Sequence, residues 1–212
     1  MEVLRAIDES LQRGEDRKVA ELTQQAVDEG LSASEILNDG LLAGMAVVGR
    51  KFGAHEIFLP EVLLAARAMN AGVEVLKPLL IAEDVPTLGK VVIGTVKGDM
   101  HDIGKNLVGI MLKGAGFEVI DLGSDVPAER FVETAAAEGA SVIGLSALLT
   151  TTMTGMQNVV DLIAARGLEG EIKVIVGGAP LSKDFAAEIG AHGYGYDATS
   201  AVDLVKEITG VA

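Results

Sequence analysis

The chain has 212 residues and a formal net charge of −14, which argues against a nucleic-acid surface because such a surface needs a basic footprint. The same acidic balance gives no reason to expect binding to an anionic membrane, and no run approaches the roughly 20 apolar residues that span a bilayer. Cysteine is absent, which excludes disulfides, thiolate metal sites and a cysteine nucleophile. With no signal-peptide pattern at the start, we expect a cytoplasmic protein.

The first part of the chain, up to about residue 82, carries only helical patterns. Apolar residues recur at spacings of three and four in four stretches, near residues 3–12, 15–30, 32–41 and 60–76. Ser32 and Glu35 match a capping box, and Pro60 suits the first turn of a helix. Four helices with short loops favour a bundle, so we predict a helical bundle domain over residues 1–85. The polar segment 83–89, with a proline and a glycine, is the expected linker.

The second part, residues 90–212, alternates β-branched runs with helical stretches. The candidate strands are 91–96, 118–122, 141–146, 173–176 and a weaker one at 193–196. This alternation implies right-handed crossovers and a parallel sheet with helices on both faces. We therefore predict an α/β domain with a five-stranded, flavodoxin-like (Rossmann-like) sheet in the order 2-1-3-4-5. Ligands of such sheets bind beyond the carboxyl ends of the strands.

The run Gly98–Asn106 directly follows the first candidate strand. It is neither a dinucleotide fingerprint nor a P-loop, because it lacks the glycines that these motifs need at their fixed spacings. Asp99 lies two residues before His101, close enough to hold one ring nitrogen and to leave the other free as a metal ligand. Asp102 suits a capping or loop-shaping role. A histidine with a surface or structural role is the alternative interpretation of this loop.

Three later loops at the same edge are lined with hydroxyls or free of bulk. Ser146 and Thr152 bracket a hydroxyl-rich segment after the third strand, Gly177–Ala179 follows the fourth, and the run with Tyr194 and Asp197 marks the fifth. Each alone is explained by a helix cap or a tight turn. Together they favour a long ligand that lies between the loops and reaches down beside the sheet.

These motifs, in this order, resemble the cobalamin-binding signature of the B12-dependent methyltransferases and mutases. The matching parts are Asp99-x-His101-x-x-Gly104, then Ser146-x-Leu148, then Gly177-Gly178. The resemblance implies a bound cobalamin or related corrinoid. The residues that it places at the cofactor in this half of the chain are Gly98, Asp99, Met100, His101, Asp102, Ile103, Gly104, Ser146, Leu148, Thr150, Thr152, Gly177, Gly178, Ala179, Tyr194 and Asp197.

In that family the corrinoid is bound base-off/His-on, so the resemblance implies that His101 is the lower ligand of cobalt. It further implies that Asp99 holds the far ring nitrogen, that Ser146 faces the benzimidazole, and that the paired glycines make room for the nucleotide tail. Methionine synthase uses a serine in a hydrogen-bond relay with the aspartate and histidine. This chain has Thr152 at that place, and a threonine hydroxyl can do the same work.

The helical half carries a second resemblance. The segment from Phe52 to Pro60 is similar to the segment of methionine synthase and its corrinoid-protein relatives that caps the upper corrin face. Phe52 and Leu59 match the apolar cap residues, which implies that they shield the methyl group. Ordinary core packing followed by a proline-started helix is the other explanation for this segment.

The size and layout resemble the small corrinoid proteins of methylamine, methanol and methoxyaromatic methyltransferase systems. The resemblance implies a methyl carrier that accepts a methyl group on Co(I) from a substrate-specific methyltransferase and passes it to a second, acceptor methyltransferase. It implies methylcobalamin as the loaded cofactor and a reductive activator as a further partner. By this interpretation the chain is a carrier subunit of a multi-component methyltransferase rather than a complete enzyme.

Three alternatives stay open at the level of sequence. A B12-dependent sensor pairs a similar bundle and corrinoid domain with a DNA-binding module, against which the acidic charge counts. A mutase subunit needs a barrel chain above the corrin, which the cap helices would obstruct. A metal hydrolase without a corrinoid would use Asp99, His101 and Asp102, and it needs His192 to approach the first loop while leaving the glycine loops unexplained.

Overall fold

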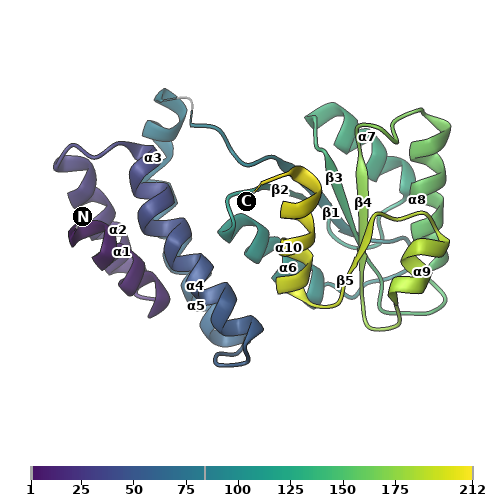
Figure 1. Ribbon diagram of the computed structural model, residues 1–212, viewed down its shortest axis with the longest axis horizontal. Coiled ribbons are helices and arrows are strands. Elements are labelled where there is room, and N and C mark those ends of the chain that lie inside the picture. Colours follow the sequence, from purple (N-terminus) through teal and green to yellow (C-terminus); the bar gives the residue numbers. More distant parts are fainter. Residues whose placement is uncertain (1, 84, 212) are drawn as a thin grey trace. The chain divides into compact units, whose positions relative to one another are not determined.

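The computed structural model describes residues 2–83 and 85–211 (Figure 1). The described residues divide into two compact units. One contains the chain up to Pro86 together with Gly114–Gly116, and the other contains Thr87–Lys113 and the chain from Phe117 onward. The expected linker, residues 83–89, includes Asp84, which lies outside the described residues. None of the helices in the described residues is both long and apolar enough to cross a membrane.

The first unit is helical, as predicted. Its elements are α1 (Glu2–Gln12), α2 (Asp16–Asp28), α3 (Ala33–Glu35), η1 (Ile36–Leu42), α4 (Ala43–Gly53) and α5 (Leu59–Ala82). Because α3, η1 and α4 follow one another without a break, the described residues form four helical stretches, as the sequence predicts. The capping box is present, since Ser32 accepts a bond from the backbone of Glu35 and the Glu35 carboxylate accepts one from the backbone of Ser32.

The π-helical segment η1 in the third stretch was not predicted. Glycines accompany it where the stretch packs on α1. A Cβ on Gly40 would lie 3.2 Å from the side chain of Ile7, and one on Gly44 would lie 3.2 Å from the backbone oxygen of Asp8. The wider π turn and the missing side chains therefore occur together at a close helix–helix contact. Ile7 and Leu41 are fully buried in the core of this unit.

The second unit is an α/β domain. Its strands are β1 (Lys90–Thr95), β2 (Glu118–Asp121), β3 (Val142–Ser146), β4 (Lys173–Gly177) and β5 (Gly193–Gly195), and its helices are α6 (Ile103–Gly114), α7 (Ala128–Glu138), α8 (Thr154–Ala165), α9 (Lys183–Glu188) and α10 (Ala198–Thr209). Within the described residues the sheet has five parallel strands in the order β2-β1-β3-β4-β5. The predicted fold class and strand order are confirmed.

Helices cover both faces of this sheet, with α6 and α10 on one side and α7, α8 and α9 on the other (Figure 1). The carboxyl ends of the strands share one edge, where the register aligns Thr95, Ser146, Gly177 and Gly195 in a row. Alternation along a strand sends the side-chain positions of such a row to one face. That face is the α10 side, because a Cβ on Gly195 would meet Ala201 of α10 at 2.9 Å.

Candidate functional site

Asp99 is the centre of the candidate site. Its side chain is fully buried, and within the described residues five donors reach its carboxylate. Oδ1 accepts from the backbone N–H of His101 (3.1 Å) and from its ring Nδ1 (2.7 Å). Oδ2 accepts from the backbone N–H groups of Leu148 (2.8 Å) and Leu149 (3.1 Å) and from Oγ1 of Thr152 (2.8 Å). One carboxylate thus joins the loop after β1 to the loop after β3.

These hydrogen bonds decide the charge of Asp99. Burial raises the pKa of the carboxyl group and is the largest single influence. Hydrogen bonds from the backbone of His101 and Leu148, and from the side chains of His101 and Thr152, together outweigh burial and hold the pKa well below its usual range. Asp99 is therefore a buried carboxylate anion at neutral pH.

The charge on Asp99 sets the roles of its two side-chain donors. A carboxylate only accepts, so Nδ1 of His101 carries a proton, and in the neutral form of the ring Nε2 is the unprotonated nitrogen. The single hydroxyl proton of Thr152 has two acceptors in reach, Asp99 Oδ2 at 2.8 Å and the backbone oxygen of Leu149 at 2.9 Å. The charged acceptor makes the stronger bond, so Thr152 donates to Asp99.

The loop that carries Asp99 is held by a residue that the sequence did not single out. Asp125, in the left-handed region at φ 56°, accepts from the backbone N–H of Gly98 at 2.7 Å and donates its own N–H to the backbone oxygen of Asp99 at 3.0 Å. Gly98 itself has a φ of 85°, where a side chain would be strained. The connection after β2 thus shapes the connection after β1.

Exposed apolar side chains gather on the same loops. Met100 and Ile103 follow β1, Leu148 and Leu149 follow β3, and Tyr196 follows β5; they are between 41% and 81% exposed. His101, whose side chain is 52% exposed, lies between Met100 and Ile103 in the sequence. Large apolar groups left in water at one edge of a sheet are typical of a ligand surface.

The row of small residues at the strand ends, Thr95, Ser146, Gly177 and Gly195, lies beside this surface. Ser146 and Gly177 are half-buried neighbours in the register, and a Cβ on Gly177 would meet only the backbone oxygen of Gly195, at 3.3 Å. Gly178 differs, because a Cβ there would overlap with the backbone oxygen of Ala147. Gly177 therefore leaves space at the strand ends, whereas Gly178 permits the close approach of two loops.

The structure brings together most of the residues that the sequence placed at one site, namely those of the loops after β1, β3 and β4. Gly104, Thr150 and Ala179 are exposed on these loops or just after them. The carboxylate of Asp102 accepts from the side-chain amide of Asn106 at 3.0 Å, so it shapes the first turn of α6 through a side-chain pair.

Two predicted residues make defined contacts within the protein. Tyr194 packs against the hydrophobic core under α8 and α9, on the face opposite to Gly193 and Gly195. Asp197 caps α10 by accepting from the backbone N–H of Ser200 at 2.7 Å. Alternation along β5 places the ring of Tyr194 on the face of the sheet opposite to Gly195, and its place at the cofactor stays a prediction. The neighbouring Tyr196 is the exposed aromatic residue of this loop.

The hydrolase alternative fails on geometry. His192 lies before β5 and its Nδ1 accepts from the backbone N–H of Val174, near the start of β4, at 3.1 Å. It therefore sits at the edge of the sheet opposite to His101. In the described residues no three His, Asp or Glu side chains are grouped to hold a metal ion.

In the helical unit, Phe52 lies near the end of α4 and Leu59 begins α5; both side chains are half-buried. Phe58, which the sequence did not single out, is 67% exposed. His55 lies between these elements in the left-handed region, with a φ of 59°. The predicted cap segment is thus a tight turn between two helices that presents one aromatic ring to solvent.

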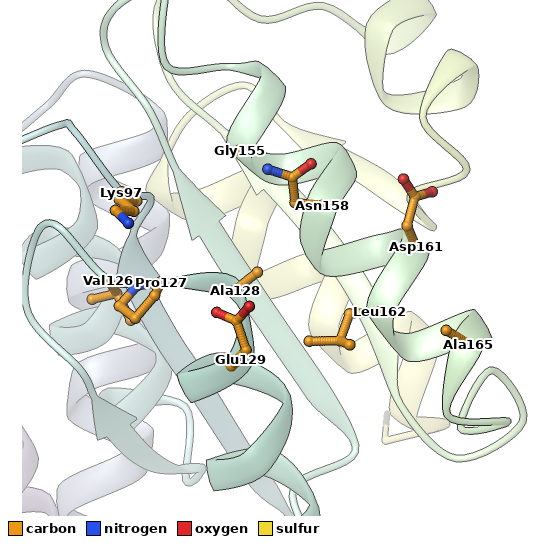
Figure 2. Close-up of a pocket in the computed structure, with 10 residues that line it drawn as sticks. All are labelled: Lys97, Val126, Pro127, Ala128, Glu129, Gly155, Asn158, Asp161, Leu162 and Ala165. Atoms are coloured by element: carbon orange, nitrogen blue, oxygen red, sulfur yellow. The ribbon is translucent and has the colours of Figure 1, made fainter.

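A groove of about 460 Å³ lies between α7 and α8 (Figure 2). Lys97, Glu129 and Asp161 supply its charged groups, and Val126 and Leu162 are among its apolar ones. None of its ten lining residues is one of the predicted site residues. The groove opens on the face of the sheet opposite to the row of small residues, so it is separate from the site around Asp99.

Comparison with known proteins identifies the family. Families described as "B12 binding domain" match residues 89–203 and residues 3–77. The chain is also 43% identical to a corrinoid protein of Desulfitobacterium hafniense, over 99% of each chain. This chain belongs to the corrinoid-protein family. This chain is also 42% identical to trimethylamine corrinoid protein 1 of Methanosarcina mazei, over 97% of this chain and 96% of that one.

A solved structure agrees with this assignment. This chain is similar in structure to a chain of the methanol:cobalamin methyltransferase complex of Methanosarcina barkeri. The TM-score is 0.89 and the identity 33%, with all of this chain and 81% of that chain covered. The resemblance drawn from the sequence motifs is thereby confirmed.

The residues present fit a corrinoid. Such a cofactor combines a cobalt centre, a broad ring with apolar edges, and a nucleotide tail. His101 offers one unprotonated ring nitrogen, Met100 and Leu148 are among the apolar side chains next to it, and the row with Ser146 and Gly177 leaves space beside the sheet. Each part of the cofactor thus has chemically matching residues at this edge.

Proposed function

We propose that this corrinoid protein is a methyl carrier. It accepts a methyl group from a substrate-specific methyltransferase and presents it to an acceptor methyltransferase, and a reductive activator restores the cofactor when it is oxidised. The names of its relatives, which include trimethylamine and methanol systems, support this role. A bound corrinoid supplies the cobalt centre that carries the methyl group, and His101 would hold it in a base-off/His-on form.

The observation that carries the proposal is the set of bonds around His101. Within the described residues, its backbone N–H and its Nδ1 are both bound by Asp99, and its backbone oxygen accepts from Thr95 at 2.9 Å. Nε2 is therefore the one polar atom of His101 that is left for a ligand. A ring fixed in one tautomer and held by a buried carboxylate is the arrangement of a metal-ligating histidine.

The same bonds determine where a proton goes when His101 is not ligated. The proton enters at Nε2, because Nδ1 already carries one and donates it to Asp99. Asp99 stays ionised, since its pKa is held far below neutrality, and so it neutralises the charged ring. Thr152 donates to Oδ2 of Asp99, which is not the oxygen that the ring contacts.

The remaining predicted residues take supporting roles. Ser146 and Gly177 line the space in which the nucleotide tail would lie, and Gly178 allows the loops after β3 and β4 to approach. Phe52 and Leu59 are the residues that the family resemblance assigns to shielding the methyl group from water.

The ligand role of His101 is tested on protein loaded with cobalamin and reduced to the Co(II) form. With the histidines labelled with ¹⁵N, we expect the electron paramagnetic resonance spectrum to show splitting from one ¹⁵N nucleus, which the benzimidazole of the cofactor does not give, and we expect His101→Ala to remove it. The chain has three histidines, so His55→Ala and His192→Ala are matched controls that keep the splitting. If the splitting persists in His101→Ala, the assignment is wrong.

The carrier role needs a second measurement. Methylation of the loaded, reduced protein by methylamine-specific and methanol-specific methyltransferases is followed by its visible spectrum. We expect one of these partners to methylate the wild-type protein, and we expect the product to be demethylated by an acceptor methyltransferase. Binding of cobalamin without methylation by any substrate-specific methyltransferase would contradict the carrier role and favour a sensor.

A further inference from the structure

Thr95 is buried completely and makes a bond that neither the motif nor the family resemblance assigns. It is the last residue of β1, and its Oγ1 donates to the backbone oxygen of His101 at 2.9 Å. Its own main chain is fixed on both sides: the N–H of Thr95 donates to the oxygen of Gly123, and its oxygen accepts from the N–H of Val126. The hydroxyl is therefore presented from a rigid point of the sheet.

The bond completes a set of restraints on His101. Asp99 accepts from the N–H of His101, which fixes the peptide plane before its Cα. Thr95 donates to the oxygen of His101, which fixes the peptide plane after its Cα. With both planes held, the direction of the Cα–Cβ bond is set, and the bond from Nδ1 to Asp99 then orients the ring.

Asp99 cannot supply the second restraint, because all its bonds reach His101 from the amino-terminal side or from the ring. After His101 the chain enters α6, where Met100 and Ile103 on either side are exposed. Among the described residues, Thr95 is the donor that holds the oxygen of the peptide between His101 and Asp102. Loss of that bond removes one of the restraints that set the position of Nε2.

The geometry points to Thr95 as a positioning residue for the imidazole of His101. Resting on the proposed function, this inference deepens it: the histidine is aimed at cobalt by a hydroxyl on β1 as well as by Asp99. Thr95 touches neither cofactor nor substrate in this arrangement and acts only through His101.

The test compares Thr95→Val, which keeps the shape and removes the donor, with Thr95→Ser, which restores it. Thr199→Val is the matched control. Its Oγ1 is also buried in the α/β unit, and no hydrogen-bond partner for it lies among the described residues. Thermal unfolding of all variants checks that each is folded.

The first readout uses the protein without corrinoid. Amide hydrogen exchange at His101 reports the bond to Asp99, which the Thr95 substitution does not touch directly. We expect Thr95→Val to speed this exchange about 3- to 10-fold, the range that corresponds to losing one neutral hydrogen bond. Thr95→Ser and Thr199→Val should match the wild type. Unchanged exchange in Thr95→Val would overturn the inference.

The second readout uses cobalamin-loaded protein in the Co(II) form. The fraction with splitting from ¹⁵N-labelled histidine measures histidine ligation, and we expect the ratio of ligated to unligated cobalt to fall about 3- to 10-fold in Thr95→Val. Thr95→Ser should restore that ratio. If the wild type shows no splitting, the proposed function fails, while the exchange measurement still decides the role of Thr95. Wild-type splitting with an unchanged ratio in Thr95→Val would refute the positioning role alone.

Discussion

At the scale of single residues, Asp99 has two separate functions. It orients the ring of His101, and it joins the loop after β1 to the backbone of Leu148 and Leu149 after β3. A buried anion is tolerated because its donors outweigh the loss of water. Asp99 thus holds the two loops together as well as orienting His101.

Asp99→Asn tests this at the level of stability. The substitution turns an amide NH₂ toward donors, so we expect the free energy of unfolding at pH 7 to fall by about 2–4 kcal/mol. Because the folded pKa of Asp99 is lowered, its stabilisation is present above the unfolded value near 3.9 and is lost as the pH falls below it. The gap between wild type and variant in urea unfolding should therefore narrow from pH 6 to pH 3. A gap that stays constant would contradict this account.

At the scale of elements, a buried ion pair anchors α6, the helix that follows His101. Lys105, whose side chain is only 3% exposed, binds both carboxylate oxygens of Asp121 at the end of β2 and Oδ1 of Asn106. Asn106 in turn donates to Asp102. This chain of contacts ties the first turn of α6 to the sheet, and it gives the lysine of the Gly104-Lys105 motif a role that the sequence did not reveal.

Removing Asp121 and removing Lys105 should not destabilise the protein equally. Asp121→Asn leaves a buried ammonium group without its counter-ion, so we expect a loss of about 2–4 kcal/mol in the free energy of unfolding. Lys105→Met leaves a carboxylate that is 38% exposed and can be hydrated, so we expect a loss of less than about 1 kcal/mol. Chemical denaturation of both single variants measures the difference. Equal losses would show that the lysine is not effectively buried in solution.

At the scale of the whole molecule, two units with separate cores share one chain. The fully buried side chains of Ile7 and Leu41 belong to the helical unit, and those of Phe131 and Ile143 belong to the α/β unit. The two family matches, over residues 3–77 and 89–203, are also separated between these units. We propose that the boundary follows the predicted linker and that each unit folds by itself.

A fragment of residues 87–212 tests this proposal. It contains the full sheet with the helices that cover its two faces, and its size suffices for an independent hydrophobic core. We expect one cooperative urea transition and retention of histidine ligation when the fragment is loaded with cobalamin. The control is the full chain under the same conditions. A non-cooperative transition of the fragment would show that the α/β unit depends on the helical one.

Much of the fold was readable from local patterns. Apolar spacing of three and four marked the helices, β-branched runs marked the strands, and their alternation determined a parallel sheet and its strand order. These features are local because side-chain direction repeats every 3.6 or 2 residues. Asp99 and His101 could be paired from the sequence alone, since two residues of one loop cannot lie far apart.

Tertiary structure shows which distant residues complete the site. Thr152 reaches Asp99 across 53 residues, as the family resemblance implied and the spacing could not. Asp125 reaches Gly98, Lys105 reaches Asp121, and Thr95 aligns with Ser146 only through the register of the sheet. Such contacts depend on how strands are paired and how loops are bent. A threonine at the end of a strand looks like any other β-branched residue until the fold places a carbonyl oxygen within reach of its hydroxyl.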